Sequence, residues 1–94
     1  MAAVAMTVVV LPRSLAALFP GMPHRLTLER GPETVGEVIA ALDARWPGVR
    51  DRLCEAGPAL RPFINVYVDG EPGTFATPVP GGSTVHVLPA VAGG

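Results

Sequence analysis

The sequence reads Thr84-Val85-His86-Val87-Leu88 and continues as Pro89-Ala90-Val91-Ala92-Gly93-Gly94. The first segment is short and rich in β-branched residues, which predicts a β-strand. The second segment, residues 89–94, carries no side chain that can act as an acid, a base, a nucleophile or a metal ligand. We predict that it is a flexible tail, about 20 Å long when extended. Its two glycines lack a Cβ, so the tail fits a narrow cleft, and the reactive group at its end is the α-carboxylate of Gly94.

The N-terminal segment Val4–Leu11 is predicted to be a second β-strand, which pairs with the last one. Its centre, Val8-Val9-Val10, is β-branched, and Pro12 ends it. The nearly continuous apolar character predicts burial on both faces, as in the central strand of a mixed sheet. These valines, together with Val85 and Val87, favour a sheet in which the first and last strands pair in parallel at the centre.

The main helix is predicted to begin at Thr34. With Thr34 as the N-cap and Glu37 three residues later, the sequence has the pattern of a capping box. Apolar residues then recur at spacings of three and four, which places them on one helical face: Val35, Val38, Ile39, Leu42 and Trp46. Pro47-Gly48 ends the helix. We expect the apolar face to pack on the sheet.

The remaining predicted elements are short. The alternation in His24–Arg30 predicts a strand with Leu26 and Leu28 on one face, and residues 63–68 predict another strand from their aromatic and β-branched content. Asp69-Gly70 predicts a tight hairpin turn. The other predictions are a helical turn or a loop over 14–19, a helical turn over 49–53, a loop over 54–62, a short edge strand around Thr74-Phe75, and a turn over 80–83.

The order of these elements predicts the fold. Strand, strand, helix, strand, short strand and strand form an α+β domain, with a mixed sheet of about four to five strands and one main helix packed on it. Right-handed crossovers and short connections favour the β-grasp, or ubiquitin-like, fold as a common solution. We expect one domain over residues 1–94 because a chain of this length supports a single core.

Composition argues against several classes of protein. Apolar residues make up 49% of the chain and charged residues 16%, which favours a packed core over disorder. The formal net charge is −1, so we expect no nucleic-acid partner. No apolar run approaches the ~20 residues of a membrane span, and residues 1–6 lack the positive region of a signal peptide. We therefore predict a cytoplasmic protein with no membrane partner, which starts at Met1 or at Met6.

Few side chains suggest catalysis or metal binding. Cys54 is the single cysteine, which excludes an internal disulfide and a cysteine-cluster metal site. We expect Cys54 to pack as a small apolar side chain or to lie in a loop without a chemical role. His24 and His86 are too far apart to form a local metal motif. Arg50-Asp51-Arg52 predicts a solvated charged stretch, with a docking role as the alternative. We expect neither a metal site nor a catalytic residue in this chain.

Along nearly its whole length the chain resembles the MoaD/ThiS family of ubiquitin-like sulfur carriers. The segments that carry the resemblance include the helix start, two turns and the tail: Val8–Leu11, Thr34–Val38, Phe63–Gly70, Gly81–Ser83 and Leu88–Gly94. Phe63–Val68 and Leu88–Gly94 are most similar to the CysO-like branch, whose members deliver sulfur for cysteine-type biosynthesis.

The resemblance implies a function for the tail. In the family, an ATP-dependent, ubiquitin-activating-type enzyme adenylates the terminal glycine, and sulfur then displaces AMP to leave a thiocarboxylate. Gly94 would carry the sulfur, whereas Gly93, Ala92, Val91 and Ala90 would form the slender part that enters partner enzymes. The ATP and its Mg belong to the activating partner. The chain is therefore expected to be a protein co-substrate, not an enzyme, and to bind no cofactor itself.

Several functions remain open at this stage. The sulfur acceptor favoured by the resemblance is a cysteine-synthase-like enzyme or one that inserts sulfur into a natural product. The alternatives are the small subunit of molybdopterin synthase and a ubiquitin-like modifier that forms isopeptide bonds with lysines. A further alternative is a passive β-grasp binding module, in which the Gly93-Gly94 end has no role.

Overall fold

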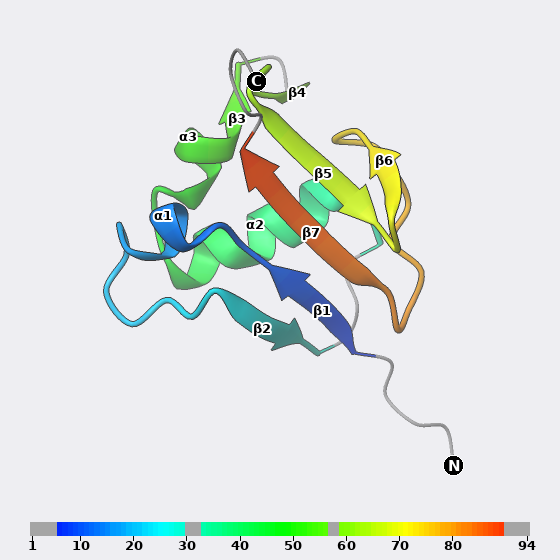
Figure 1. The fold of residues 1–94 in the computed structure, drawn as a ribbon, viewed down its shortest axis with the longest axis horizontal. Helices are drawn as coiled ribbons and strands as arrows, with labels where there is room; N and C mark the ends of the chain where they lie inside the picture. The colour runs from blue at the N-terminus through cyan, green and yellow to red at the C-terminus, as the bar shows by residue number, and fades with distance from the viewer. Residues whose placement is uncertain (1–5, 30–32, 57–58, 90–94) are drawn as a thin grey trace.

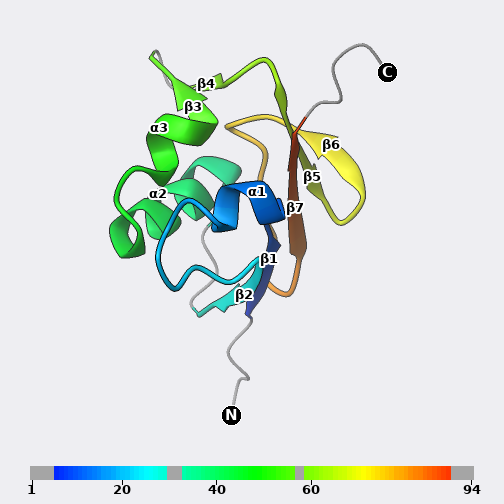
Figure 2. The same cartoon turned by 60° about the vertical axis from the view of Figure 1, so that its left-hand side comes forward.

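A computed structural model describes residues 6–29, 33–56 and 59–89. It contains a mixed five-stranded sheet in the order β2-β1-β7-β5-β6, with the long helix α2 packed across one face (Figures 1 and 2). The strands are β1 (Thr7–Val10), β2 (Arg25–Leu28), β5 (Ile64–Val68), β6 (Glu71–Gly73) and β7 (Thr84–Pro89), and α2 spans Val35–Arg45. The predicted β-grasp architecture is confirmed.

Strand β7 lies at the centre of the sheet. It pairs in parallel with β1, where Val9 lies opposite Val85, and antiparallel with β5, where Val66 lies opposite Val87. These four valines are at most 2% exposed and form the sheet side of the core. The prediction that β1 is buried on both faces is wrong. Val8 and Val10 are half-buried, because α2 covers only one face of the sheet and leaves the other open.

Helix α2 begins as the sequence predicts. The Thr34 hydroxyl accepts a hydrogen bond from the amide of Glu37 at 3.2 Å. The return bond differs from that of a standard capping box, because the Glu37 carboxylate accepts from the amide of Glu33 rather than that of Thr34. The predicted apolar face is buried over Val35, Val38, Ile39 and Leu42, and Trp46 packs against it partly buried.

The segment after β6 packs on the start of α2. The predicted edge strand around Thr74-Phe75 is wrong: β6 follows the Asp69-Gly70 turn at once and ends at Gly73. The two-residue turn explains this, since it sets Glu71 directly opposite Val68. The next residues instead hold α2, because the carbonyl of Phe75 accepts from the amide of Gly36 at 2.8 Å.

Replacing Gly36 with alanine tests that contact. A Cβ at Gly36 would lie 2.5 Å from the Phe75 ring, so the ring must move, and overpacking of this kind costs about 1–3 kcal/mol. Alanine also favours the helix by about 1 kcal/mol. We expect Gly36→Ala to lower the free energy of unfolding in the wild-type background and to raise it in a Phe75→Ala background. Urea unfolding of all four proteins measures this, and an effect of the same sign in both backgrounds would contradict it.

The smaller elements lie at one end of the sheet. They are α1 (Arg13–Ala16), α3 (Val49–Leu53) and the strands β3 (Cys54–Glu55) and β4 (Ala59–Leu60). The predicted loop over 54–62 is therefore wrong in part, because Cys54 pairs with Leu60 and Glu55 with Ala59 in a separate two-stranded sheet. Cross-strand packing of the buried Cys54 favours this hairpin over a loop.

Two carboxylates hold backbone amides in the folded state. The amides of Arg50 and Gly48 donate to Oδ1 of Asp43 at 3.0 and 3.1 Å, and the amide of Thr84 donates to Oδ1 of Asp69 at 2.9 Å. These bonds favour the charged form, so the pKa of each carboxyl lies below its ordinary value of 3.8. Asp69 also has a φ of +50° in the turn, a conformation that aspartate tolerates.

The lowered pKa values predict a loss of stability in acid. Each carboxylate stabilises the folded state above its ordinary pKa, and that contribution is lost as the pH falls below it toward the folded pKa. We expect the melting temperature to fall below about pH 5, and the double variant Asp43→Asn/Asp69→Asn to show a shallower fall. Scanning calorimetry from pH 7 to pH 2 measures both. Asp51→Asn is the matched control, since its carboxylate accepts no backbone hydrogen bond among the described residues; an equal flattening there would refute the assignment.

None of the helices in the described ranges is both long enough and apolar enough to cross a membrane.

Candidate functional site

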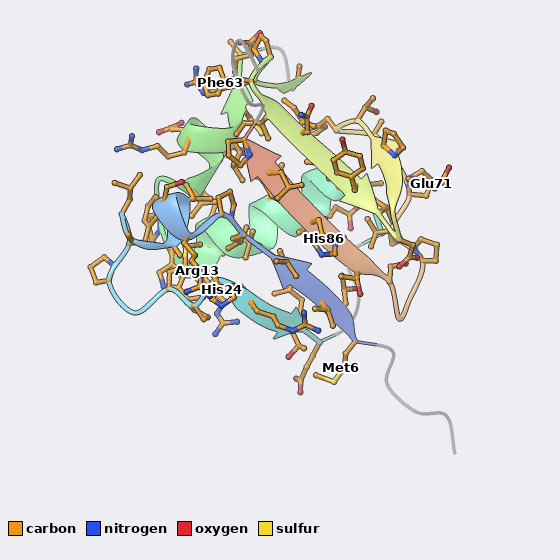
Figure 3. All side chains as sticks on the ribbon, in the orientation of Figure 1. Met6, Arg13, His24, Phe63, Glu71 and His86 are labelled. Atoms are coloured by element: carbon orange, nitrogen blue, oxygen red, sulfur yellow. The ribbon has the colours of Figure 1, made fainter. Side chains whose placement is uncertain are left out.

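The candidate site is the surface from which the chain leaves β7. The predicted site residues Ala90, Val91, Ala92, Gly93 and Gly94 lie outside the described residues. β7 extends to Pro89, one residue beyond its predicted end, and there it pairs with Ile64 at the start of β5. The segment that follows therefore starts from the middle of the sheet, beside the loop that contains Phe63 (Figure 3). This placement follows from a central last strand, since its end cannot lie at a sheet edge.

A cavity of about 210 Å³ opens at this point, and we call it the exit cavity. It lies between α1, α3 and the ends of β5 and β7, and its lining includes Pro12, Leu15, Leu18, Arg52, Leu53 and Phe63 as well as Pro89. Leu15 and Leu53 are buried, so they are part of the core. Leu18 and Phe63 are 53% and 55% exposed, and because they line the same cavity they form an apolar patch that another molecule can contact.

Two arginines lie at this end of the molecule, together with Asp51. Arg52 lines the exit cavity and also a neighbouring cavity, where it meets Asp51, Arg61 and Phe63. The Arg61 side chain donates two hydrogen bonds, of 2.9 and 2.7 Å, to the main-chain carbonyl of Asp51. A carbonyl orients the guanidinium without neutralising its charge, so Arg61 remains a cation beside the cavity. Of the predicted charged stretch 50–52, the structure brings Arg52 to the exit.

The open face of the sheet carries the second exposed region. His86 lies on it, opposite α2, with Val10 and Tyr67 directly beside it on the neighbouring strands (Figure 3). Leu88 continues this row toward Pro89 and is 42% exposed. His86 itself is half-buried on this face.

The remaining candidate side chains do not form a reactive centre. Cys54 is buried, and burial raises the pKa of its thiol although Arg50 and Arg61 oppose the shift. A thiol of raised pKa is a poor nucleophile at neutral pH, in agreement with its predicted role as a small apolar residue. No cluster of three metal-ligating side chains occurs in the part of the chain that the structure describes.

The sequence did not single out Leu18 or Phe63 as site residues, and Phe63 was predicted only as the first residue of a strand. Leu18 belongs to a segment predicted as a helical turn or a loop, and it is distant in sequence from both α3 and β7. Only the folded chain brings these residues together. The available signal is a large apolar residue close to a proline in segments where turn residues usually predominate: Leu18 lies two residues before Pro20, and Phe63 directly follows Pro62.

Comparison with known proteins places this geometry in a family. The model of the ThiS family matches residues 10–94. The sulfur carrier protein CysO of Mycobacterium tuberculosis is 41% identical over 68 residues, which cover 66% of this chain and 73% of that protein. Small archaeal modifier protein 3 of Haloferax volcanii is 38% identical over 65 residues, covering 65% of this chain and 70% of that protein. The crystal structure of the Amycolatopsis orientalis BexX/CysO complex contains a chain with a TM-score of 0.78 and 35% identity, which covers 94% of this chain and 99% of its own.

Proposed function

The chain belongs to the ThiS family, on its CysO-like branch, and from this premise we propose that it is a sulfur carrier protein on which other enzymes act. One observation carries the proposal: the Gly93-Gly94 pair follows the central strand of a β-grasp sheet, and Gly94 lies five residues beyond Pro89. A chain that leaves the middle of the sheet can extend away from the folded body. Named relatives that share the fold and more than a third of the sequence support the assignment.

The proposed chemistry takes place at the Gly94 carboxylate. A carboxylate is a poor electrophile, because its charge is delocalised and it has no good leaving group. In the activating enzyme, the Gly94 carboxylate attacks the α-phosphorus of ATP, pyrophosphate leaves, and an acyl-adenylate forms. A sulfide-equivalent nucleophile then attacks the carbonyl carbon, AMP leaves with the electrons of the C–O bond, and a thiocarboxylate remains. The partner enzyme binds the ATP and its Mg.

The role of this chain in those steps is to present the tail. Gly93 has no Cβ, and Ala90, Val91 and Ala92 are slender, so the segment can enter a narrow active site. The folded body contributes recognition, through the exposed side chains at the exit cavity and on the open face of the sheet. The thiocarboxylate then serves as a soft nucleophile for a sulfur-accepting enzyme of cysteine or natural-product biosynthesis. The CysO chain that was solved in complex with BexX supports a protein partner for this chain.

A second function, ubiquitin-like protein modification, is favoured by the likeness to small archaeal modifier protein 3. The same acyl-adenylate could react with the lysine amine of a target protein and form an isopeptide bond. The two functions predict different products. A modifier yields species of higher mass on a denaturing gel, which disappear when Gly94 is deleted.

The experiment is a reconstitution with the ubiquitin-activating-type enzyme of the native host. ATP–pyrophosphate exchange that depends on the full-length chain would support adenylation of Gly94, and addition of a sulfide source should then yield a thiocarboxylate detected by mass spectrometry. Absence of exchange at every carrier concentration would refute the proposed function. Conjugates to lysines in a host lysate, without any thiocarboxylate, would favour the modifier.

A further inference from the structure

We propose that the exit cavity is a docking pocket for one large apolar side chain of the activating enzyme, next to a carboxylate of that enzyme that pairs with Arg52. The inference rests on the proposed function and adds to it the chemistry of the partner surface. It is carried by three features of the described residues: the position of the cavity at Pro89, its apolar walls and floor, and the guanidinium group of Arg52 in its lining.

The position of the cavity places it next to the partner that binds the tail. Pro89 is the last described residue and lines the cavity. Five further residues extend at most about 18 Å, at 3.3–3.6 Å per residue. An enzyme that holds Gly94 in a closed active site must therefore bring the entrance of that site close to Pro89. The walls of the cavity then face the entrance of the active site.

The shape and lining of the cavity select an apolar group. Its volume is about 210 Å³. A cavity of about 150 Å³ is large enough to bind benzene, so the exit cavity has room for one large apolar side chain. Leu15 and Leu53 form a buried floor, and the half-exposed Leu18 and Phe63 belong to its walls. A concave apolar site with exposed walls is where one anchoring side chain of a partner gains most from burial.

The positive charge of Arg52 favours an acidic residue of the partner next to its anchoring apolar side chain. Arg52 lines the exit cavity, and Arg61 is held beside it by its two hydrogen bonds to the carbonyl of Asp51. The Arg52 guanidinium presents a planar fork that can pair with a carboxylate in a bidentate manner. We therefore expect one or more Asp or Glu residues around the active-site entrance of the partner.

The test measures carrier-dependent ATP–pyrophosphate exchange with the activating enzyme of the native host. Arg52→Glu places like charges together, and Leu18→Ser removes an apolar wall at an exposed position that should not affect folding. We expect each variant to raise the KM for the carrier by about tenfold or more, with kcat within about twofold of wild type. Thermal unfolding of each variant checks that the fold is retained.

Arg50→Glu is the matched control. Arg50 lies two residues from Arg52 on the same helix and has the same charge, but it lines a different cavity, beside Cys54 and Phe75. We expect its KM to stay within about twofold of wild type, since an exposed charge outside the interface has little effect on affinity.

Two alternative occupants of the cavity, the chain's own tail and a second copy of the chain, would give different results. If the chain's own tail occupied it, with the Gly94 carboxylate on Arg52, Arg52→Glu would free the tail and lower the KM. If a second copy occupied it, Leu18→Ser would weaken dimerisation in sedimentation experiments and leave the KM unchanged. Either result overturns the inference, as would a KM within about twofold of wild type for both Arg52→Glu and Leu18→Ser. In all these cases wild-type exchange shows that the proposed function stands, whereas absence of wild-type exchange refutes both.

Discussion

Deletion of Gly94 abolishes sulfur loading and leaves the melting temperature unchanged: this is the largest functional effect that we expect. The deletion leaves a terminal glycine, Gly93, but withdraws the carboxylate by about 3.3–3.6 Å. A misplacement of about 1 Å at a reacting centre can cost about 100-fold in rate, so a whole residue should reduce adenylation below detection. The last buried core residue along the chain is Val87, and β7 itself ends at Pro89, five residues before the deleted glycine.

Thiocarboxylate formation and thermal unfolding of the same preparation measure the two halves of this prediction. Deletion of both Gly93 and Gly94 should give the same result as the single deletion. A fall in melting temperature as large as that caused by a core substitution would show that the tail is part of the folded body. Full loading of the shortened chain would show that Gly94 is not the sulfur-carrying residue.

The converse variant, Leu42→Ala, should lower stability without changing the chemistry of the tail. Leu42 is fully buried on the face of α2 that packs on the sheet. Removing its side chain in such a site costs about 2–5 kcal/mol, from the lost burial and the cavity that remains. That is a large part of the 5–15 kcal/mol by which domains of this kind are usually stable. Urea unfolding should show the loss, while the folded fraction is still loaded with sulfur.

Leu18→Ala is the matched control for stability. The chemical change is the same, but Leu18 is 53% exposed, so the free energy of unfolding should change by about 0.5 kcal/mol at most. Equal losses for Leu42→Ala and Leu18→Ala would mean that α2 is not the centre of the core. A Leu42→Ala protein that is folded but cannot be loaded would mean that the core and the tail are coupled.

The elements with a strong local signal could be predicted from the sequence. Thr34 and Glu37 marked the start of α2, because the side chain of an N-cap bonds to a backbone amide only a few residues away. The β-branched residues around Val9 and Val85 indicated the two central strands, and their parallel pairing is confirmed. The Asp69-Gly70 turn followed from residues that tolerate a positive φ.

Features that depend on contacts between distant segments could not be predicted in this way. Phe75 lies outside any strand because its carbonyl and ring pack against Gly36, about forty residues earlier in the chain. Val8 and Val10 are apolar but half-buried, since none of the described helices covers their face of the sheet. The exit cavity combines Leu18, Arg52 and Phe63, which no short sequence pattern connects.

The intact mass of the protein purified from its native host tests the central claim most directly. If the chain is a sulfur carrier, part of the protein should be heavier by the exchange of one oxygen for sulfur, and fragmentation should place that change at Gly94. The heavier species should disappear after deletion of Gly94. A free carboxylate alone, which stays unchanged after incubation with ATP, the activating enzyme and a sulfide source, would contradict the claim and favour a passive binding module.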